Sequence, residues 1–357
     1  MKKALKSSLG AALLSVMLTG CGNGGNNQSC GSADSQNNSK APMSVILDTD
    51  LGSSTDDVVT LACLYNLMDQ ADSSMDAIEL KAIMVNREGA ANAKLADLMN
   101  TYYKHTEVPI GLVQHGKKDP RVFIDYWKVA EPDTYADEPR LARTLSDNDI
   151  AQLPDAYKLY RKILAEAGDS SVTILSIGFA SNLAHLLESG ADEFSQLNGT
   201  DLVRQKVAGI YLQAGHFGDA MEPDYNFTQD AEHAKVFMKL CQAPMFFSPQ
   251  EAGDMFDYAI ADVLSDLEQA GDTLSPLYHC YKHHNCDTGQ RMWDVITLIQ
   301  WLRPDLFDCH GPSDIYMDDD MVLHEGAKTA SSNRSWMFPK EDCKGQIMEL
   351  IRRYASN

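Results

Sequence analysis

The fold is decided by one stretch of sequence, Val45-Ile46-Leu47-Asp48-Thr49-Asp50-Leu51-Gly52-Ser53-Ser54-Thr55-Asp56-Asp57. A short apolar run, typical of a buried strand, delivers four carboxylates and several hydroxyls to its end. Apolar residues at helical spacing follow, at Val58, Leu61, Ala62, Tyr65 and Met68. The stretch therefore predicts the end of a strand and the start of an amphipathic helix, which is the edge where open α/β sheets bind ligands.

The same alternation of strands and helices continues along the chain. We expect strands at 44–47, 78–85, 108–113, 172–177, 207–212 and 245–247. We expect helices after residue 57 and at 90–103, 154–167, 182–187 and 231–240. Strands regularly separated by helices imply βαβ units. The predicted fold class is α/β, with an open, mainly parallel, Rossmann-like central sheet, helices on both faces, and a surface loop or insertion over 117–148.

Composition narrows the function classes. The chain has 357 residues, 51 Asp+Glu against 30 Lys+Arg, and a formal charge of -21. Because nucleic-acid phosphates are held mainly by Lys and Arg, this excess of acid argues against a nucleic-acid partner. A hydrophobic content of 44% is enough for a sizeable core and excludes disordered and fibrous classes. No GxGxxG or Walker pattern follows a strand, so neither NAD nor ATP is indicated as a cofactor.

The N-terminus has the pattern of a targeting segment. Three lysines precede an uncharged apolar run from Leu9 to Gly20, which is too short to cross a bilayer. Residues 1–20 are therefore predicted to be a signal peptide.

The end of this segment, Leu18-Thr19-Gly20-Cys21, resembles a bacterial lipobox, in which the cysteine is acylated and becomes the mature N-terminus. The alternative is ordinary signal cleavage with an incidental cysteine. Residues 21–41 would then be the lipidated Cys21 and a flexible polar tether, and 42–357 a single domain. We expect a lipid-anchored protein of the bacterial cell envelope, and Gly22 favours the outer membrane over the inner membrane.

Four aspartates within ten residues repel one another, and burying them is costly unless a cation or a firm hydrogen-bond network compensates. Oxygen ligands suit Ca²⁺ or Mg²⁺ rather than zinc. The alternative is an acidic loop in which Asp56 caps the helix, but one cap needs only one aspartate. We therefore favour a metal site here. A later acidic run, Asp318-Asp319-Asp320, is typical of a solvated turn.

Asp48-Thr49-Asp50-Leu51-Gly52 followed by Asp56-Asp57 resembles the N-terminal signature of the nucleoside hydrolase family, the inosine-uridine-preferring N-ribohydrolases. Members of that family have a compact DxDxGxDD, and the longer spacing here is similar to a divergent, lipoprotein-like branch. Later segments resemble family segments in the right order: Met84-Val85-Asn86, Ser176 to Ala184, Gln213-Ala214-Gly215, Asp224-Tyr225-Asn226-Phe227 and Trp293-Asp294. The resemblance runs from residue 43 to about residue 300.

The resemblance implies the nucleoside hydrolase fold and calcium-dependent hydrolysis of the N-glycosidic bond of a ribonucleoside or related N-riboside, giving free base and ribose. It implies that Ca²⁺ is held by Asp50, Asp57, Asp294 and the main-chain carbonyl of Ser181, with Asp50 as the general base. It assigns substrate binding to Asp56, Asn86, Gln213, Asp224, Asn226 and Trp293. Related enzymes are homodimers or homotetramers.

Help for the leaving base is where this chain departs from the family. Trp293 stands where many members have a histidine, and an indole can stack on a base but cannot act as an acid near neutral pH. His216, His283 and His284 are the alternatives.

Two functions of different classes therefore follow. The first is a Ca²⁺-dependent hydrolase of N-ribosides. The second is an envelope lipoprotein that binds a nucleoside or sugar-like ligand without turnover, and a third reading is a hydrolase of a related pentosyl substrate.

Overall fold

The computed structural model describes residues 42–52, 54–70, 76–117, 129–131, 141–219, 221–283 and 290–356. The predicted signal peptide, lipidated Cys21 and tether lie outside the described residues. Residues from Lys40 to Asn357 form one compact unit. No helix within the described ranges is both long and apolar enough to cross a membrane.

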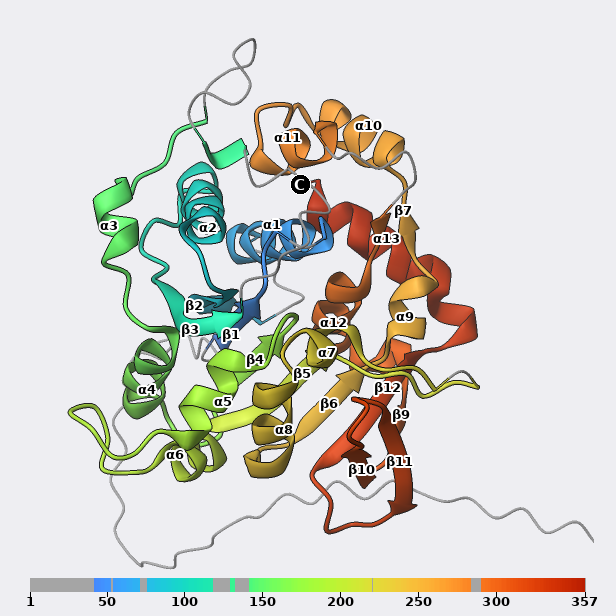
Figure 1. Ribbon diagram of the computed structural model, residues 1–357. Helices are drawn as coiled ribbons and strands as arrows, with labels where there is room; N and C mark the ends of the chain where they lie inside the picture. The colour runs from blue at the N-terminus through green and yellow to red at the C-terminus, as the bar shows by residue number, and fades with distance from the viewer. Residues whose placement is uncertain are drawn as a thin grey trace, which may run out of the picture. The chain divides into compact units, whose positions relative to one another are not determined.

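A parallel sheet forms the centre of this unit (Figure 1). Among the described residues it has eight strands in the order β3-β2-β1-β4-β5-β6-β12-β9. Neighbouring strands are parallel, except that β12 and β9 are antiparallel. The pairs β10–β11 and β7–β8 form separate two-stranded sheets. The predicted α/β class with a mainly parallel sheet is confirmed.

The strands are β1 (Met43–Thr49), β2 (Ile78–Arg87), β3 (Ile110–Lys117), β4 (Val172–Ser176), β5 (Val207–Gln213), β6 (Met245–Ser248), β7 (Asp257–Tyr258), β8 (Gln290–Arg291), β9 (Phe307–His310), β10 (Ser313–Met317), β11 (Leu323–Lys328) and β12 (Arg334–Pro339). The α-helices are α1 (Asp56–Asp69), α2 (Ala90–Tyr102), α3 (Asp147–Ala151), α4 (Ala156–Glu166), α5 (Ser181–Glu188), α6 (Gly199–Lys206), α7 (Tyr225–Gln229), α8 (Ala231–Leu240), α9 (Gln250–Asp254), α10 (Ile260–Ala270), α11 (Pro276–Lys282), α12 (Trp293–Leu302) and α13 (Lys344–Ala355).

Helices cover both faces of the sheet because its central strands are apolar on both sides. Successive side chains of a strand point to opposite faces. Val45 and Leu47 of β1 belong to the core cluster that includes α1, α2, α12 and α13. Ile46, between them, belongs to the cluster that includes α4, α5, α6 and α8. This two-sided burial explains why β1 is an unbroken apolar run in the sequence.

The order of the strands reverses beside β1. The chain runs outward from β1 to β2 and β3, and then returns to place β4 on the other side of β1. Strand order therefore reverses between β1 and β4, and α/β sheets bind ligands outside the carboxyl ends of the strands at such a switch point. The acid-rich stretch follows β1 at this position.

The third strand is longer than predicted. We expected it at 108–113, whereas β3 runs from Ile110 to Lys117. Its last four residues include exposed Gln114 and His115, so they lack the apolar pattern on which the prediction depended. β3 nevertheless ends at Lys117, the residue at which the predicted 117–148 loop begins.

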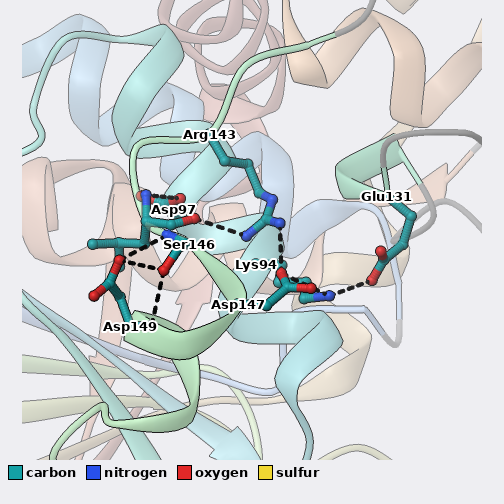
Figure 2. A network of polar contacts seen from close by, with 8 residues as sticks. Lys94, Asp97, Glu131, Arg143, Ser146, Asp147 and Asp149 are labelled. Carbon is teal, nitrogen blue, oxygen red and sulfur yellow. Dashed lines mark hydrogen bonds and ion pairs between the residues drawn. The ribbon is translucent and has the colours of Figure 1, made fainter.

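The described part of that predicted loop contains a helix start. Ser146 caps α3 in a reciprocal arrangement, in which its hydroxyl accepts from the Asp149 backbone and Asp149 accepts from the Ser146 backbone. Figure 2 shows how polar contacts attach this segment to α2. Lys94 of α2 lies 3.2 Å from Asp147 and 3.0 Å from Glu131. Val129 and Ala130 of this segment are also buried in the main core, so charge pairs and apolar contacts together hold the segment on the domain.

Sequence analysis predicted no elements after residue 247, where the structure adds helices and strands. Two of the added helices, α12 and α13, contribute to the core on the α1 side of the sheet. α12 is important for the site because its first turn carries Asp294.

Candidate metal centre and substrate site

Three buried aspartates meet beside the switch point. Asp56 and Asp57 open α1, and Asp294 lies in the first turn of α12. Each of the three offers a carboxylate oxygen within 4.8 Å of the others. We call Asp56, Asp57 and Asp294 the buried triad. Two helix N-termini converge on it, and their dipoles favour negative charge at this place.

Hydrogen bonds fix two members of the triad. The Asp294 backbone N–H donates to Asp56 Oδ2 at 3.0 Å, and the Ser54 hydroxyl donates to Asp56 Oδ1. The Thr49 hydroxyl donates to Asp57 Oδ1. Asp56 therefore does not cap its own helix, whose cap position is Thr55; it accepts from the start of α12 instead. The alternative of a simple helix-capping aspartate does not describe this geometry.

Ionising the triad in the absence of a cation is unfavourable. Burial raises the pKa of Asp56 to about 6. Burial and the nearby charges of Asp50 and Asp56 raise the pKa of Asp57 well above its usual range. Burial and the same aspartates also raise the pKa of Asp294. A divalent cation would relieve both the burial cost and the mutual repulsion.

The triad fits a hard cation by its donors as well as by its charge. Asp57 Oδ2 is buried and has no hydrogen-bond partner among the described residues. An orphaned, buried carboxylate oxygen costs free energy, and a metal ion would satisfy it. The donors gathered here are all oxygens, which suit Ca²⁺ or Mg²⁺.

Asp50 lies beside the triad but pairs with a different group. It is 3% exposed, and its Oδ2 is 3.5 Å from Nη2 of Arg87. Its negative charge contributes to the raised pKa of all three members of the triad. The structure thus groups Asp56 with Asp57 and Asp294, whereas sequence analysis assigned the metal to Asp50 and left Asp56 to the substrate. The roles of Asp50 as ligand and general base stay predictions.

Asp48, at the end of β1, organises the neighbouring strand ends. It accepts from Asn86 Nδ2 at 2.6 Å, from the Tyr160 hydroxyl at 2.7 Å and from Asn182 Nδ2 at 3.2 Å. Burial outweighs these bonds and raises its pKa to about 7. The Asn86 Oδ1 in turn accepts from the Phe179 backbone at 3.1 Å. Asn86 therefore ties β1 to the loop after β4, and its predicted contact with ribose stays a prediction.

The loop after β4 approaches Asp50 closely. A Cβ on Gly178 would lie 2.4 Å from the Asp50 backbone nitrogen, so only glycine fits. Ser181, which opens α5, is fully buried, and its hydroxyl donates to the Asn86 carbonyl at 3.1 Å. Ser181 thus lies next to Asn86, at the carboxyl end of β2. Its main-chain carbonyl as a calcium ligand stays a prediction.

A second group of predicted residues lies at the carboxyl end of β5. Asn226 Nδ2 donates to Gln213 Oε1 at 2.8 Å. Both oxygens of buried Asp224 are used by the backbone, one by Phe227 at 2.8 Å and one by Gly215 at 2.7 Å. Asp224 therefore caps α7 and holds the loop after β5. Its predicted contact with ribose would have to coexist with these bonds.

Trp293 is half-buried and packs on α9. Its Nε1 donates to Asp254 Oδ1 at 3.0 Å, and Gly253 approaches so closely that a Cβ there would lie 2.4 Å from the indole. His216, the alternative acid, is 8% exposed and lies 4.0 Å from Glu251 Oε1. His283 follows α11, and the other alternative, His284, lies outside the described residues.

Sequence reasoning missed two residues of this region, Arg87 and Tyr160. Arg87 is 8% exposed and follows Asn86 at the end of β2, where a charged residue after a buried strand was the available signal. Tyr160 has the spacing of an ordinary core residue of α4, and nothing in its sequence context indicates the bond to Asp48.

Neither models of known protein families nor curated protein sequences match the chain. Solved structures do match it. A plant nucleoside hydrolase is similar with a TM-score of 0.65 at 15% identity, covering 88% of this chain and 99% of the other. The inosine-uridine-preferring nucleoside hydrolase of Bacillus anthracis is similar with a TM-score of 0.60 at 16% identity, covering 88% and 99%.

The type III effector protein XopQ, solved in complex with adenosine diphosphate ribose, is also similar, with a TM-score of 0.62 at 16% identity over 88% of this chain and 94% of the other. At these identities the likeness concerns the fold, which hydrolases and effector proteins share. The resemblance noted in the sequence is confirmed at that level: the chain has the nucleoside hydrolase fold.

Proposed function

We propose that the protein is a calcium-dependent hydrolase that cleaves the N-glycosidic bond of a ribonucleoside or a related N-riboside. The observation that carries the proposal is the buried triad at the switch point of a nucleoside hydrolase fold, with an orphaned oxygen on Asp57. Asp57 and Asp294, with Asp50 and the main-chain carbonyl of Ser181, would hold the ion. When bound, Ca²⁺ would orient a nucleophilic water and lower its pKa.

The residues of the chain would then supply the remaining chemistry. A ribosyl bond breaks through an oxocarbenium-like transition state, and carboxylates around the sugar stabilise its developing positive charge. Asp50 would take the proton of the attacking water as general base. Asp56, Asn86, Asp224 and Asn226 would hold the ribose hydroxyls, which fixes the anomeric carbon relative to that water.

A substrate whose base departs easily needs the least protonation of that base by an acid of the enzyme. Trp293 donates its indole N–H to Asp254, so the group at this position holds α9 rather than acting as an acid. Of the alternative histidines, His216 is buried and lies 4.0 Å from Glu251 Oε1. We therefore favour substrates with a good leaving base, and Trp293 would bind substrate through the face or edge of its ring.

Release of free base tests the proposal directly. The purified protein is incubated with a panel of nucleosides and Ca²⁺, and base and reducing sugar are quantified. We expect turnover that is lost in EDTA, restored by Ca²⁺, and reduced roughly 10³-fold in Asp57→Asn. The matched control is Asp308→Asn, an exposed aspartate on β9, which should keep full activity. Failure of every riboside to react while Ca²⁺ still binds would contradict a hydrolase.

A second function remains because of Trp293. Binding of a nucleoside or sugar-like ligand without turnover would suit a site that keeps its carboxylates but has an indole bonded to Asp254 where an acid is needed. Ligand titration of the same panel by calorimetry separates the two. Saturable riboside binding with no base released would establish the binder.

The proposed location is the bacterial cell envelope, through a lipid on Cys21, with the outer membrane favoured. The support is the lipobox-like sequence before Cys21. Incorporation of a labelled fatty acid should be lost in Cys21→Ala, and the wild-type protein should fractionate with membranes. We also propose a homodimer or homotetramer, and light scattering would measure this state.

A further inference from the structure

Two histidines face each other on the helix layer opposite the buried triad. His185 of α5 and His233 of α8 have their Nε2 atoms 3.1 Å apart. Their rings are perpendicular, with centroids 4.7 Å apart. The two helices pack against each other on the α4–α8 side of the sheet (Figure 1). Neither histidine belongs to the site described above.

A carboxylate orients one of the rings. His233 Nδ1 lies 2.8 Å from Oδ1 of Asp230, which is 6% exposed and precedes α8. A histidine that donates its Nδ1 proton to a carboxylate turns the lone pair of Nε2 outward, as in the carboxylate–histidine–metal arrangement of many metal sites. His233 Nε2 is therefore prepared to act as an electron-pair donor, and it points at His185.

Two facing Nε2 atoms can share a proton or bind one cation. Zinc binds histidine nitrogen at about 2.0–2.1 Å in tetrahedral geometry, which places two such nitrogens roughly 3.3 Å apart. The observed 3.1 Å needs only a small opening of the pair. The distance thus matches two ligands of one tetrahedral ion, and both rings would turn so that their Nε2 lone pairs point at the ion.

One member of the pair, His185, lies at the wall of a pocket through which water can reach it. His185, Asp155 and Glu188 line a pocket of ≈ 690 Å³. Asp155 Oδ1 is buried and has no hydrogen-bond partner among the described residues. The buried triad is the one group of three potential ligand side chains that the described ranges bring together, so the histidine pair offers two protein ligands and water must supply the others.

We propose that His185 and His233 form a second metal site, which binds a divalent transition-metal ion such as Zn²⁺ or Ni²⁺. Imidazole nitrogens suit these ions, whereas the all-oxygen triad suits Ca²⁺, so the two sites differ in the metal they select. The ion would clamp α5 to α8. Since α5 begins at Ser181 and Asp230 directly follows α7, the clamp would stiffen two elements that carry predicted site residues. This proposal does not depend on riboside hydrolysis.

Calorimetric titration with Ni²⁺ tests it. The protein is purified without a histidine tag and kept in excess Ca²⁺, so that the oxygen site is filled. We expect one Ni²⁺ per chain, and at least about tenfold weaker binding in His185→Gln and in His233→Gln, because each removes one of two protein ligands. Asp230→Asn should also weaken binding about tenfold while leaving both ligands in place.

His324→Gln is the matched control. His324 also pairs with a carboxylate, at 2.7 Å from Asp318 Oδ2, but it stacks on Tyr316 instead of facing a histidine. The control should bind Ni²⁺ like the wild type, and Ni²⁺ should raise the Tm of the wild type but not of His233→Gln. Equal affinity in wild type, His185→Gln and His233→Gln, or no saturable binding in the Ca²⁺-loaded protein, would overturn the site. Riboside turnover in the same samples reports on the proposed function separately.

Discussion

The buried triad and the acidic turn Asp318–Asp320 each gather three aspartates, but the fold surrounds them differently. The triad members open two helices and are at most 4% exposed. The turn connects β10 and β11, and Asp319 is exposed to solvent and pairs with Lys235 at 3.1 Å. Each group contributes three carboxylates to the formal net charge of the chain. Only the triad places carboxylates against one another in the interior.

The pKa values of the aspartates in the two regions are also shifted in opposite directions. A hydrogen bond from His324 and two from the backbone hold the pKa of Asp318 below its usual range, so its charge is favourable. Burial and neighbouring charge raise the pKa of Asp57, so its charge is unfavourable without a cation. The comparison shows that burial and an orphaned oxygen, rather than the density of acids, distinguish a metal site from a solvated turn.

Of the substitutions that test this comparison, Asp57→Asn should have the largest effect. It keeps the size of the side chain but removes one charge and one oxygen ligand, so we expect a roughly 10³-fold loss of kcat/KM and weaker Ca²⁺ binding. Asp319→Asn is the counterpart in the turn and should change neither quantity. Steady-state kinetics and calorimetry measure both. Equal losses in the two variants would remove the distinction between the regions.

The stability of the protein in EDTA should fall as the pH rises from about 4 to 7. Asp56, with its pKa raised to about 6, binds more protons when folded than when unfolded in this range, so the free energy of unfolding decreases with pH. A shift of about two units corresponds to about 3 kcal/mol. Asp57 and Asp294 act in the same direction.

The acidic turn changes the pH dependence of the free energy of unfolding in the direction opposite to the triad. Since the folded pKa of Asp318 is lowered, its stabilisation is present at neutral pH and is lost only as the pH falls through that pKa. Urea unfolding at several pH values, with and without Ca²⁺, measures the difference. Saturating Ca²⁺ should abolish the decline, because the ion stabilises the ionised carboxylates. A decline that persists unchanged in Ca²⁺ would mean that the triad does not bind the ion.

Local sequence was sufficient to predict where two of the three triad residues, Asp56 and Asp57, lie. Asp56 and Asp57 stand between an apolar strand and a helical pattern, and this order alone places them at a carboxyl edge. Asp294 is more than two hundred residues away, and only the family resemblance associated it with them. Its position depends on how α12 packs against α1, which no local pattern records.

Arg87 and Tyr160 show more clearly which contacts the sequence could not predict. Each has a side chain whose partner, Asp50 or Asp48, lies on a different element. Periodicity reports which face of an element is buried but does not report which polar group it meets there. The sheet was therefore predictable in its central strands, while the charge balance of the site was not.

Arg87→Met should affect metal and turnover in opposite directions. The substitution keeps an apolar stem beside Phe179 and removes the cation that lies 3.5 Å from Asp50. Removing this positive charge should strengthen Ca²⁺ binding a few-fold, whereas Asp50 loses its orienting partner and kcat should fall about tenfold, or 1.4 kcal/mol. Arg87→Lys keeps the charge but not the planar fork and should recover part of kcat. Unchanged Ca²⁺ affinity and kcat in Arg87→Met would show that the pair has no role.

Tyr160→Phe should have the smallest effect. It removes a hydrogen bond to Asp48, which shares features with both the triad and the acidic turn. Asp48 is as buried as the triad, yet like Asp318 it is satisfied by three donors, of which Tyr160 is one. Removing the hydroxyl should destabilise the fold by about 1–2 kcal/mol, since two donors remain. Because the pKa of Asp48 is about 7, the loss should be greater at pH 8.5, where the carboxylate is charged, than at pH 5.5. Tyr157→Phe, on the same helix at a partly exposed position, is the matched control. Equal losses at both pH values would show that Asp48 does not ionise in this range, and that burial rather than its donors decides its charge.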